Sequence, residues 1–182
     1  MRVNRERKFA YIHIPKTGGV SIVKNILTPL GFERIGRRHD AYDASQVEDD
    51  YFVFAFVRNP YSRAVSLYRH RYVLSERFRL KNPDVRTFLN FLHDDYRKHD
   101  KLFTQFEFLH PRVELFRFED FNKEIERLCE RLKIKKPVMK KTEYFNYYGD
   151  YNWEDWLENK DILTINELFR DDFTLGYEIW MP

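Results

Sequence analysis

Two short segments of the chain hold residue types that bind phosphate groups. The first spans residues 15–21 and reads PKTGGVS. Its glycines let the backbone turn tightly and expose N–H groups, while Lys16 adds a positive charge and Thr17 and Ser21 add hydroxyls. It is not a Walker A loop, G-x-x-x-x-G-K-[ST], because its lysine precedes both glycines. The segment therefore predicts a different kind of anion cradle, with a plain strand-to-helix turn as the alternative.

The second segment spans residues 57–66 and reads VRNPYSRAVS. Arg58 ends an apolar run, and a guanidinium in such a place can bind a phosphate through two parallel hydrogen bonds. Ser66 follows eight residues later, and its hydroxyl returns toward Arg58 only if the chain turns sharply at Asn59. The alternative is that Arg58 pairs with a carboxylate and that Ser66 is an ordinary helix serine.

Both segments lie between a predicted strand and a predicted helix. Residues 9–14 (FAYIHI) and 51–57 (YFVFAFV) are apolar runs typical of buried strands, and 113–118 (VELFRF) alternates like a third. Apolar residues recur at helical spacing after each run, and a last helix is expected over 162–173. This alternation predicts an α/β fold with a mostly parallel sheet. Because ligands bind at the carboxyl ends of such strands, both segments are expected to face one site.

Composition limits the class of protein. The 182 residues predict a single domain over 1–182, and the lone cysteine, Cys129, excludes an internal disulfide and a cysteine-based zinc site. No apolar run approaches the ~20 residues of a membrane span, so a cytoplasmic protein is expected. Residues 141–182 carry a net charge of −7 and the rest of the chain +10, which suggests an anionic ligand for the basic part. Nucleic acids, nucleotides and phosphorylated or sulfated substrates all fit that charge, although the charge alone favours the alternative of a solvated helix face.

Taken together, these motifs resemble a known family. IHIPKTGGVSI (12–22) resembles the 5′-phosphosulfate-binding loop of sulfotransferases, and FVRNPYSRAVSLY (56–68) resembles their 3′-phosphate-binding motif. The similarity is greatest to small bacterial sulfotransferase-family proteins related to Golgi carbohydrate sulfotransferases, such as heparan sulfate 2-O-sulfotransferases. Three weaker landmarks also match, namely Gln105, LFRFEDF (115–121) and DDFTLGY (171–177).

The resemblance implies the donor 3′-phosphoadenosine-5′-phosphosulfate (PAPS), the product adenosine 3′,5′-bisphosphate (PAP), and a P-loop-kinase-like three-layer fold with helices on both faces of the sheet. Many family members have Thr or Ser where this chain has Val20, so one hydroxyl contact to the donor is missing here. The segment 140–142 matches one that closes over the donor, with a solvated lysine pair as the alternative. The implied ligands of the 5′-phosphosulfate are Lys16, Thr17, Gly18, Gly19, Val20 (through its N–H) and Ser21, and those of the 3′-phosphate are Arg58 and Ser66.

Sulfuryl transfer also needs a group that takes the proton of the acceptor hydroxyl. Lys16 and the loop N–H groups would stabilise the charge that grows on the leaving phosphate, so no metal is required. His39 lies between the two motifs, where the Golgi relatives have their catalytic histidine, so the resemblance implies that it is the general base. A surface histidine paired with Asp40 is the alternative, and Glu119 is the second candidate base.

The acceptor is expected to be a hydroxyl of a carbohydrate, and arginines at 34, 37 and 38 suit one that is already anionic. Tyrosines such as Tyr42, Tyr68 and Tyr72 could stack on sugar rings, and Arg69 and Arg71 could extend the basic surface. Three other functions stay open: a P-loop-type kinase or nucleotide-binding protein, a nucleic-acid-binding module, and a degenerate relative that binds the donor without catalysis. The kinase lacks its Walker lysine and its acidic magnesium ligand here. The nucleic-acid module is disfavoured because most aromatics fall in predicted core positions.

Overall fold

The computed structural model describes residues 1–37, 39–74, 84–99, 103–139 and 152–182. The chain forms two compact units: Met1–Arg58 with Phe108–Tyr147, and Asn59–Glu107 with Tyr148–Pro182. The expectation of one domain over the whole chain stays a prediction.

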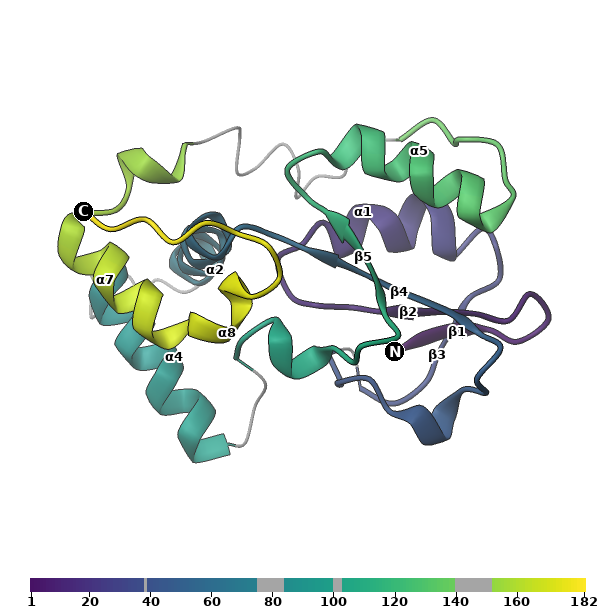
Figure 1. Cartoon of the computed structure of the whole chain (residues 1–182), viewed down its shortest axis with the longest axis horizontal. Helices are drawn as coiled ribbons and strands as arrows, with labels where there is room; N and C mark the ends of the chain where they lie inside the picture. Colours follow the sequence, from purple (N-terminus) through teal and green to yellow (C-terminus); the bar gives the residue numbers. More distant parts are fainter. Residues whose placement is uncertain (38, 75–83, 100–102, 140–151) are drawn as a thin grey trace. The chain divides into compact units, whose positions relative to one another are not determined.

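The first unit contains a five-stranded sheet in the order β3-β1-β2-β4-β5 (Figure 1). The strands are β1 (Arg2–Asn4), β2 (Phe9–Ile12), β3 (Glu33–Arg34), β4 (Phe52–Val57) and β5 (Glu114–Arg117). β2, β4 and β5 are parallel, and β1 pairs antiparallel with both β2 and β3. The three strands predicted from apolar runs are confirmed. The sheet is nevertheless mixed rather than mostly parallel, because the polar N-terminus forms a hairpin with β2.

The turn of that hairpin depends on the side chain of Asn4 and on the backbone conformation of Lys8. Asn4 Oδ1 accepts a hydrogen bond from the backbone N–H of Arg7 at 2.8 Å, and Asn4 Nδ2 donates to the carbonyl of Leu30 at 2.6 Å. Lys8 has a φ of 56°, the left-handed conformation that a tight turn demands. Backbone pairing and turn chemistry, rather than apolar patterning, therefore produce β1.

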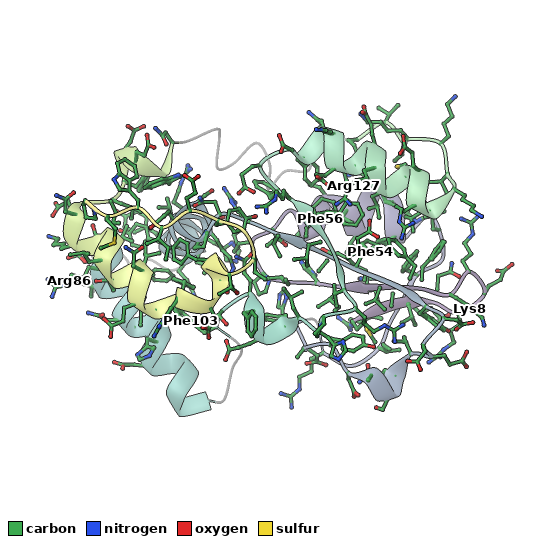
Figure 2. All side chains as sticks on the ribbon, viewed as in Figure 1. Lys8, Phe54, Phe56, Arg86, Phe103 and Arg127 are labelled. Carbon is green, nitrogen blue, oxygen red and sulfur yellow. The ribbon has the colours of Figure 1, made fainter. Side chains whose placement is uncertain are left out.

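The helices of the first unit pack on one face of this sheet (Figure 1). They are α1 (Gly19–Ile22), which continues as a π-helical turn η1 (Val23–Leu27), and α5 (Phe121–Leu132). A short 3₁₀ turn, η2 (Ala44–Gln46), lies between β3 and β4 in the chain. Phe54 and Phe56 of β4 point into the core under these helices, and Arg127 of α5 lies 3.9 Å from the ring centre of Phe116 (Figure 2). Ala55 and Val57, on the opposite face, are buried as well. β4 is therefore buried on both faces, as predicted, while the three-layer arrangement stays a prediction.

The second unit is helical. Its helices are α2 (Pro60–Leu74), α4 (Val85–His99), η4 (Trp153–Asp155), α7 (Asn159–Leu168) and α8 (Arg170–Phe173), while the 3₁₀ turn η3 (Phe106–Phe108) follows the loop that holds Gln105. The helix expected over 162–173 is interrupted at Phe169, whose ring is fully buried between α7 and α8. A buried core of aromatic and aliphatic side chains joins α2, α4, α7 and α8.

A buried ion pair lies within this helical core. Arg63 of α2 is 1% exposed, donates from Nη2 to the carbonyl of Phe103 at 3.0 Å, and lies 3.6 Å from the carboxylate of Asp172. Asp172 accepts hydrogen bonds from the backbone N–H groups of Gln105 and Phe106 at 2.6 and 3.0 Å. Two of the weaker sequence landmarks, Gln105 and the 171–177 segment, thus meet in one hydrogen-bonded network.

Candidate functional site

The loop between β2 and α1 holds a strained conformation. Lys16 has a φ of 70° and Gly18 a φ of 82°, both in the left-handed region that favours glycine. The Thr17 hydroxyl is fully buried and donates to the carbonyl of Ile14 at 3.0 Å, while the backbone N–H of Ser21 donates to the carbonyl of Gly18 at the same distance. A left-handed residue other than glycine costs free energy, and such strain concentrates at functional loops.

The two glycines of the loop are required for different reasons. A Cβ on Gly18 would lie 2.8 Å from the Phe121 ring and 3.0 Å from the Phe118 ring, in addition to the unfavourable φ. A Cβ on Gly19 would lie 2.1 Å from Nε2 of His13 and 2.9 Å from the hydroxyl of Tyr11. The backbone at this point is therefore enclosed by the rings of Tyr11 and His13 beside Gly19 and by those of Phe118 and Phe121 beside Gly18.

The helix behind the loop begins irregularly. After α1 the backbone takes a π-helical turn over Val23–Leu27, and the Thr28 N–H donates to the carbonyl of Val23 at 2.9 Å. The Asn25 side chain donates to the carbonyl of Ser21 at 2.9 Å. Such wide turns are rare and often mark functional sites. Here the hydrogen bond from the Asn25 side chain to Ser21 connects the π-helical turn to α1.

Arg58 connects the second sequence motif to the loop. It follows the last residue of β4, is 9% exposed, and donates from Nη1 to the carbonyl of Lys16 at 3.3 Å. Its guanidinium carbon lies 4.2 Å from the centre of the Phe118 ring, a distance typical of a cation–π contact. Because β2 and β4 are parallel neighbours, the structure places Lys16 and Arg58 at the same edge of the sheet.

His39 lies beside the strand that leads into the loop. Its Nδ1 is 3.0 Å from the carbonyl oxygen of His13, and the two imidazole rings are 4.7 Å apart between centres. His13 is 6% exposed, whereas His39 is exposed to solvent. The carboxylate of Asp40, the alternative partner of His39, accepts a hydrogen bond from the backbone N–H of Arg37 at 2.5 Å.

The other predicted site residues differ in their exposure. Ser66 is half-buried on α2, in the second unit, so its contact with the 3′-phosphate stays a prediction. Glu119 is exposed between β5 and α5, and Val20 is half-buried in α1. The segment 140–142 and Arg38 lie outside the described residues.

His13 and Tyr11 were not singled out as functional from the sequence. His13 is buried, as a lone histidine in a strand usually is, and its ring also stacks 5.9 Å from that of Tyr11 and faces Gly19. The Tyr11 hydroxyl is buried, has no hydrogen-bond partner among the residues that the structure describes, and has its pKa raised by burial. The available signal was their spacing, because residues 11 and 13 share one face of a strand.

Comparison with known proteins identifies the family. A family model described as "Sulfotransferase family" matches residues 1–175. The chain belongs to the sulfotransferase family. No curated protein and no solved structure matches it. Family membership points to sulfuryl transfer, with a nucleotide donor and a hydroxyl acceptor, as the class of reaction. In the described parts of this sulfotransferase-family chain, no helix is long and apolar enough to cross a membrane.

Proposed function

We propose that this protein transfers a sulfuryl group from PAPS to the hydroxyl of a carbohydrate. The observation that carries the proposal is the hydrogen bond from Arg58 to the carbonyl of Lys16. It joins the two sequence motifs at the carboxyl ends of adjacent parallel strands, in a chain of the sulfotransferase family. Cations on both sides of one loop suit a donor with two separate phosphate groups.

In this proposal the loop binds the 5′-phosphosulfate. The Lys16 ammonium and the backbone N–H groups of the loop neutralise the bridging oxygen as its bond to sulfur breaks. The Thr17 hydroxyl already donates to Ile14, so Thr17 offers its N–H rather than its hydroxyl proton, and Val20 likewise offers an N–H. Arg58, together with Ser66, binds the 3′-phosphate, and its contact with Phe118 fixes the plane of the guanidinium.

His39 acts as the general base. A carbonyl can only accept, so the contact with His13 requires a proton on Nδ1 of His39 and leaves Nε2 with a lone pair. Nε2 takes the proton of the acceptor hydroxyl while the acceptor oxygen forms its bond to sulfur. The sulfur–oxygen bond to the donor breaks in the same step, and PAP leaves with the electron pair.

The choice of a carbohydrate as the acceptor rests on the family that the sequence motifs resemble. The resemblance of the sequence motifs to those of bacterial and Golgi carbohydrate sulfotransferases supports a sugar as acceptor. The exposed Arg34 of β3 and the exposed Arg37 suit an acceptor that carries negative charge. A cytoplasmic location stays a prediction from the sequence.

Calorimetric titration with PAP, ATP and 5′-AMP tests the donor site. We expect binding of PAP that is lost when the 3′-phosphate is absent, as in 5′-AMP. We also expect Arg58→Ala to weaken PAP binding, while the matched variant of the exposed Arg5 leaves it unchanged. Equal or tighter binding of ATP would refute the PAPS donor and favour a kinase. PAP binding without turnover of PAPS would indicate a relative that has lost catalysis.

A further inference from the structure

The imidazole of His13 lies between the donor loop and His39, and the proposed reaction gives it no role. His13 is 6% exposed, so the polar atoms of its ring are largely removed from water. A Cβ on Gly19 would lie 2.1 Å from its Nε2, and the centre of its ring is 4.7 Å from that of His39. One buried side chain therefore contacts both the backbone of the loop and the ring of the proposed base.

The ring of His13 is fixed on the side of the loop. It stacks on the ring of Tyr11, with centres 5.9 Å apart and planes 30° apart, and Tyr11 is itself fully buried. Because Gly19 has no side chain, the imidazole fills the space beside its backbone. In a close-packed interior, a ring held in this way cannot turn unless the loop also moves.

The segment that carries His39 has little structure of its own to orient a side chain. His39 is exposed, and the described residues between β3 and η2 form neither helix nor strand. The main chain is held on both sides of His39, because the Ile35 N–H donates to the carbonyl of Met1 at 3.0 Å and the Tyr42 N–H donates to the carbonyl of Phe108 at 2.9 Å. These hydrogen bonds fix the path of the chain and leave the direction of the imidazole to be set by its neighbours.

Two contacts with His13 together can set that direction. The His13 carbonyl lies 3.0 Å from Nδ1 of His39 and selects the tautomer with its proton on Nδ1. A single hydrogen bond leaves the ring able to rotate about it. The His13 ring meets the His39 ring at 63°, an edge-to-face arrangement that aromatic rings prefer, and this second contact restricts the rotation.

We propose that the side chain of His13 is a positioning residue that connects the donor loop at Gly19 to His39 and fixes the direction in which Nε2 of His39 points. A change in the loop then reaches the base through one imidazole ring. That His39 is the base rests on the proposed function; the contacts of His13 with Gly19 and His39 do not.

Nitrogen-15 NMR of the histidine side chains in the full chain tests this inference, at an alkaline pH where imidazoles are neutral. The His39 signals are assigned by their loss in His39→Ala. In the wild type we expect a single tautomer of His39 with its proton on Nδ1, and a shift of these signals when PAP is added. In His13→Ala we expect a mixture of tautomers and the loss of most of the PAP-induced shift. His13→Gln fills more of the same space and should give an intermediate result; it carries the test if His13→Ala does not fold.

Turnover of PAPS separates positioning from a merely structural role. His13→Ala should lower kcat about 10- to 100-fold, as expected for a misplaced catalytic group, and change the Kd of PAP less than about three-fold. In a His39→Ala background the same change should lower turnover less than about two-fold, because no base remains to be positioned. His110 is a matched control, since it is exposed and its ring lies 5.0 Å from that of Tyr42. His110→Ala should leave the His39 tautomer and the turnover unchanged.

The outcomes for this inference and for the proposed function differ. The inference is overturned if His39 keeps one tautomer in both His13 variants, or if His13→Ala lowers turnover equally with and without His39. If PAP binds and His39→Ala loses turnover while the His13 variants behave like the wild type, the inference fails and the proposed function stands. If PAP does not bind, the proposed function fails, and the tautomer of His39 in the two His13 variants still decides whether His13 positions it.

Discussion

Replacing Gly19 by alanine tests the structural basis of the donor loop. The new Cβ would lie 2.1 Å from Nε2 and 2.3 Å from Cδ2 of the His13 ring, whereas ordinary contacts begin near 3.4 Å. The imidazole must therefore move by more than about 1 Å in a close-packed interior. His13 is 6% exposed and its carbonyl is bound by His39, so a shift of His13 also disturbs the proposed base.

The magnitude of this effect follows from two opposing contributions. Overpacking of this kind costs about 1–3 kcal/mol of folding free energy. Alanine in place of glycine in a helix returns up to about 1 kcal/mol. The net loss is therefore at most about 3 kcal/mol, which corresponds to a fall in melting temperature of up to roughly 12 °C for a protein of this size. We also expect weaker binding of PAP, because the loop N–H groups lose their positions.

A double-mutant cycle with His13→Ala isolates the contact, with thermal denaturation monitored by circular dichroism. Removing the imidazole eliminates its overlap with the new Cβ, so Gly19→Ala should cost at least about 1 kcal/mol less in the His13→Ala background. The residual cost in that background reports the contact with the Tyr11 hydroxyl, which would lie 2.9 Å away. Equal costs in both backgrounds would refute this account of the glycine.

Four further predictions concern the charges and the base. Arg58→Lys keeps the charge but loses the planar fork, so it should weaken PAP binding about as much as Arg58→Ala, by 10- to 100-fold in calorimetry. His39→Ala should lower turnover by about 10²–10⁴-fold with PAP binding unchanged, and normal turnover would remove His39 from the mechanism. Arg63→Met should lower the free energy of unfolding by about 3–5 kcal/mol in urea titrations, because it leaves Asp172 buried without its cation. Burial raises the pKa of Asp172 against the opposing charge of Arg63, so the folded chain keeps the Asp172 proton to a higher pH than the unfolded chain does. The stability of the wild type should therefore fall relative to that of Asp172→Asn as the pH rises above the ordinary aspartate pKa of 3.8. A difference in stability that stays constant with pH would contradict this.

The predictable parts of the fold are those whose residue pattern favours one type of secondary structure. Residues 52–57 are apolar at every position, rich in aromatic and β-branched residues, and followed at once by Arg58-Asn59-Pro60, which together favour a short strand buried on both faces. The hairpin strand β1 could not be found in this way. Two of its three residues, Arg2 and Asn4, are polar, and it is held by backbone pairs with β2 and β3.

The site was predictable in its charged residues and not in its supporting ones. Lys16 and Arg58 stand at strand ends, and parallel pairing of β2 with β4 brings such ends together. His13 is buried, and the sequence does not show that its ring lies against Gly19. Likewise, the break at Phe169 depends on tertiary packing of its ring, since helical spacing continues through it.

The contact of Gly18 with Phe118 and Phe121 has a consequence for the order in which the protein is made. The loop residues leave the ribosome about a hundred residues before the aromatic rings that enclose Gly18. A nascent chain that ends before Phe118 contains the complete loop sequence but lacks the two aromatic rings that pack against Gly18. The anion cradle therefore acquires its final shape only after synthesis has passed the β5–α5 connection, and truncated chains that lack it should be unable to bind the donor.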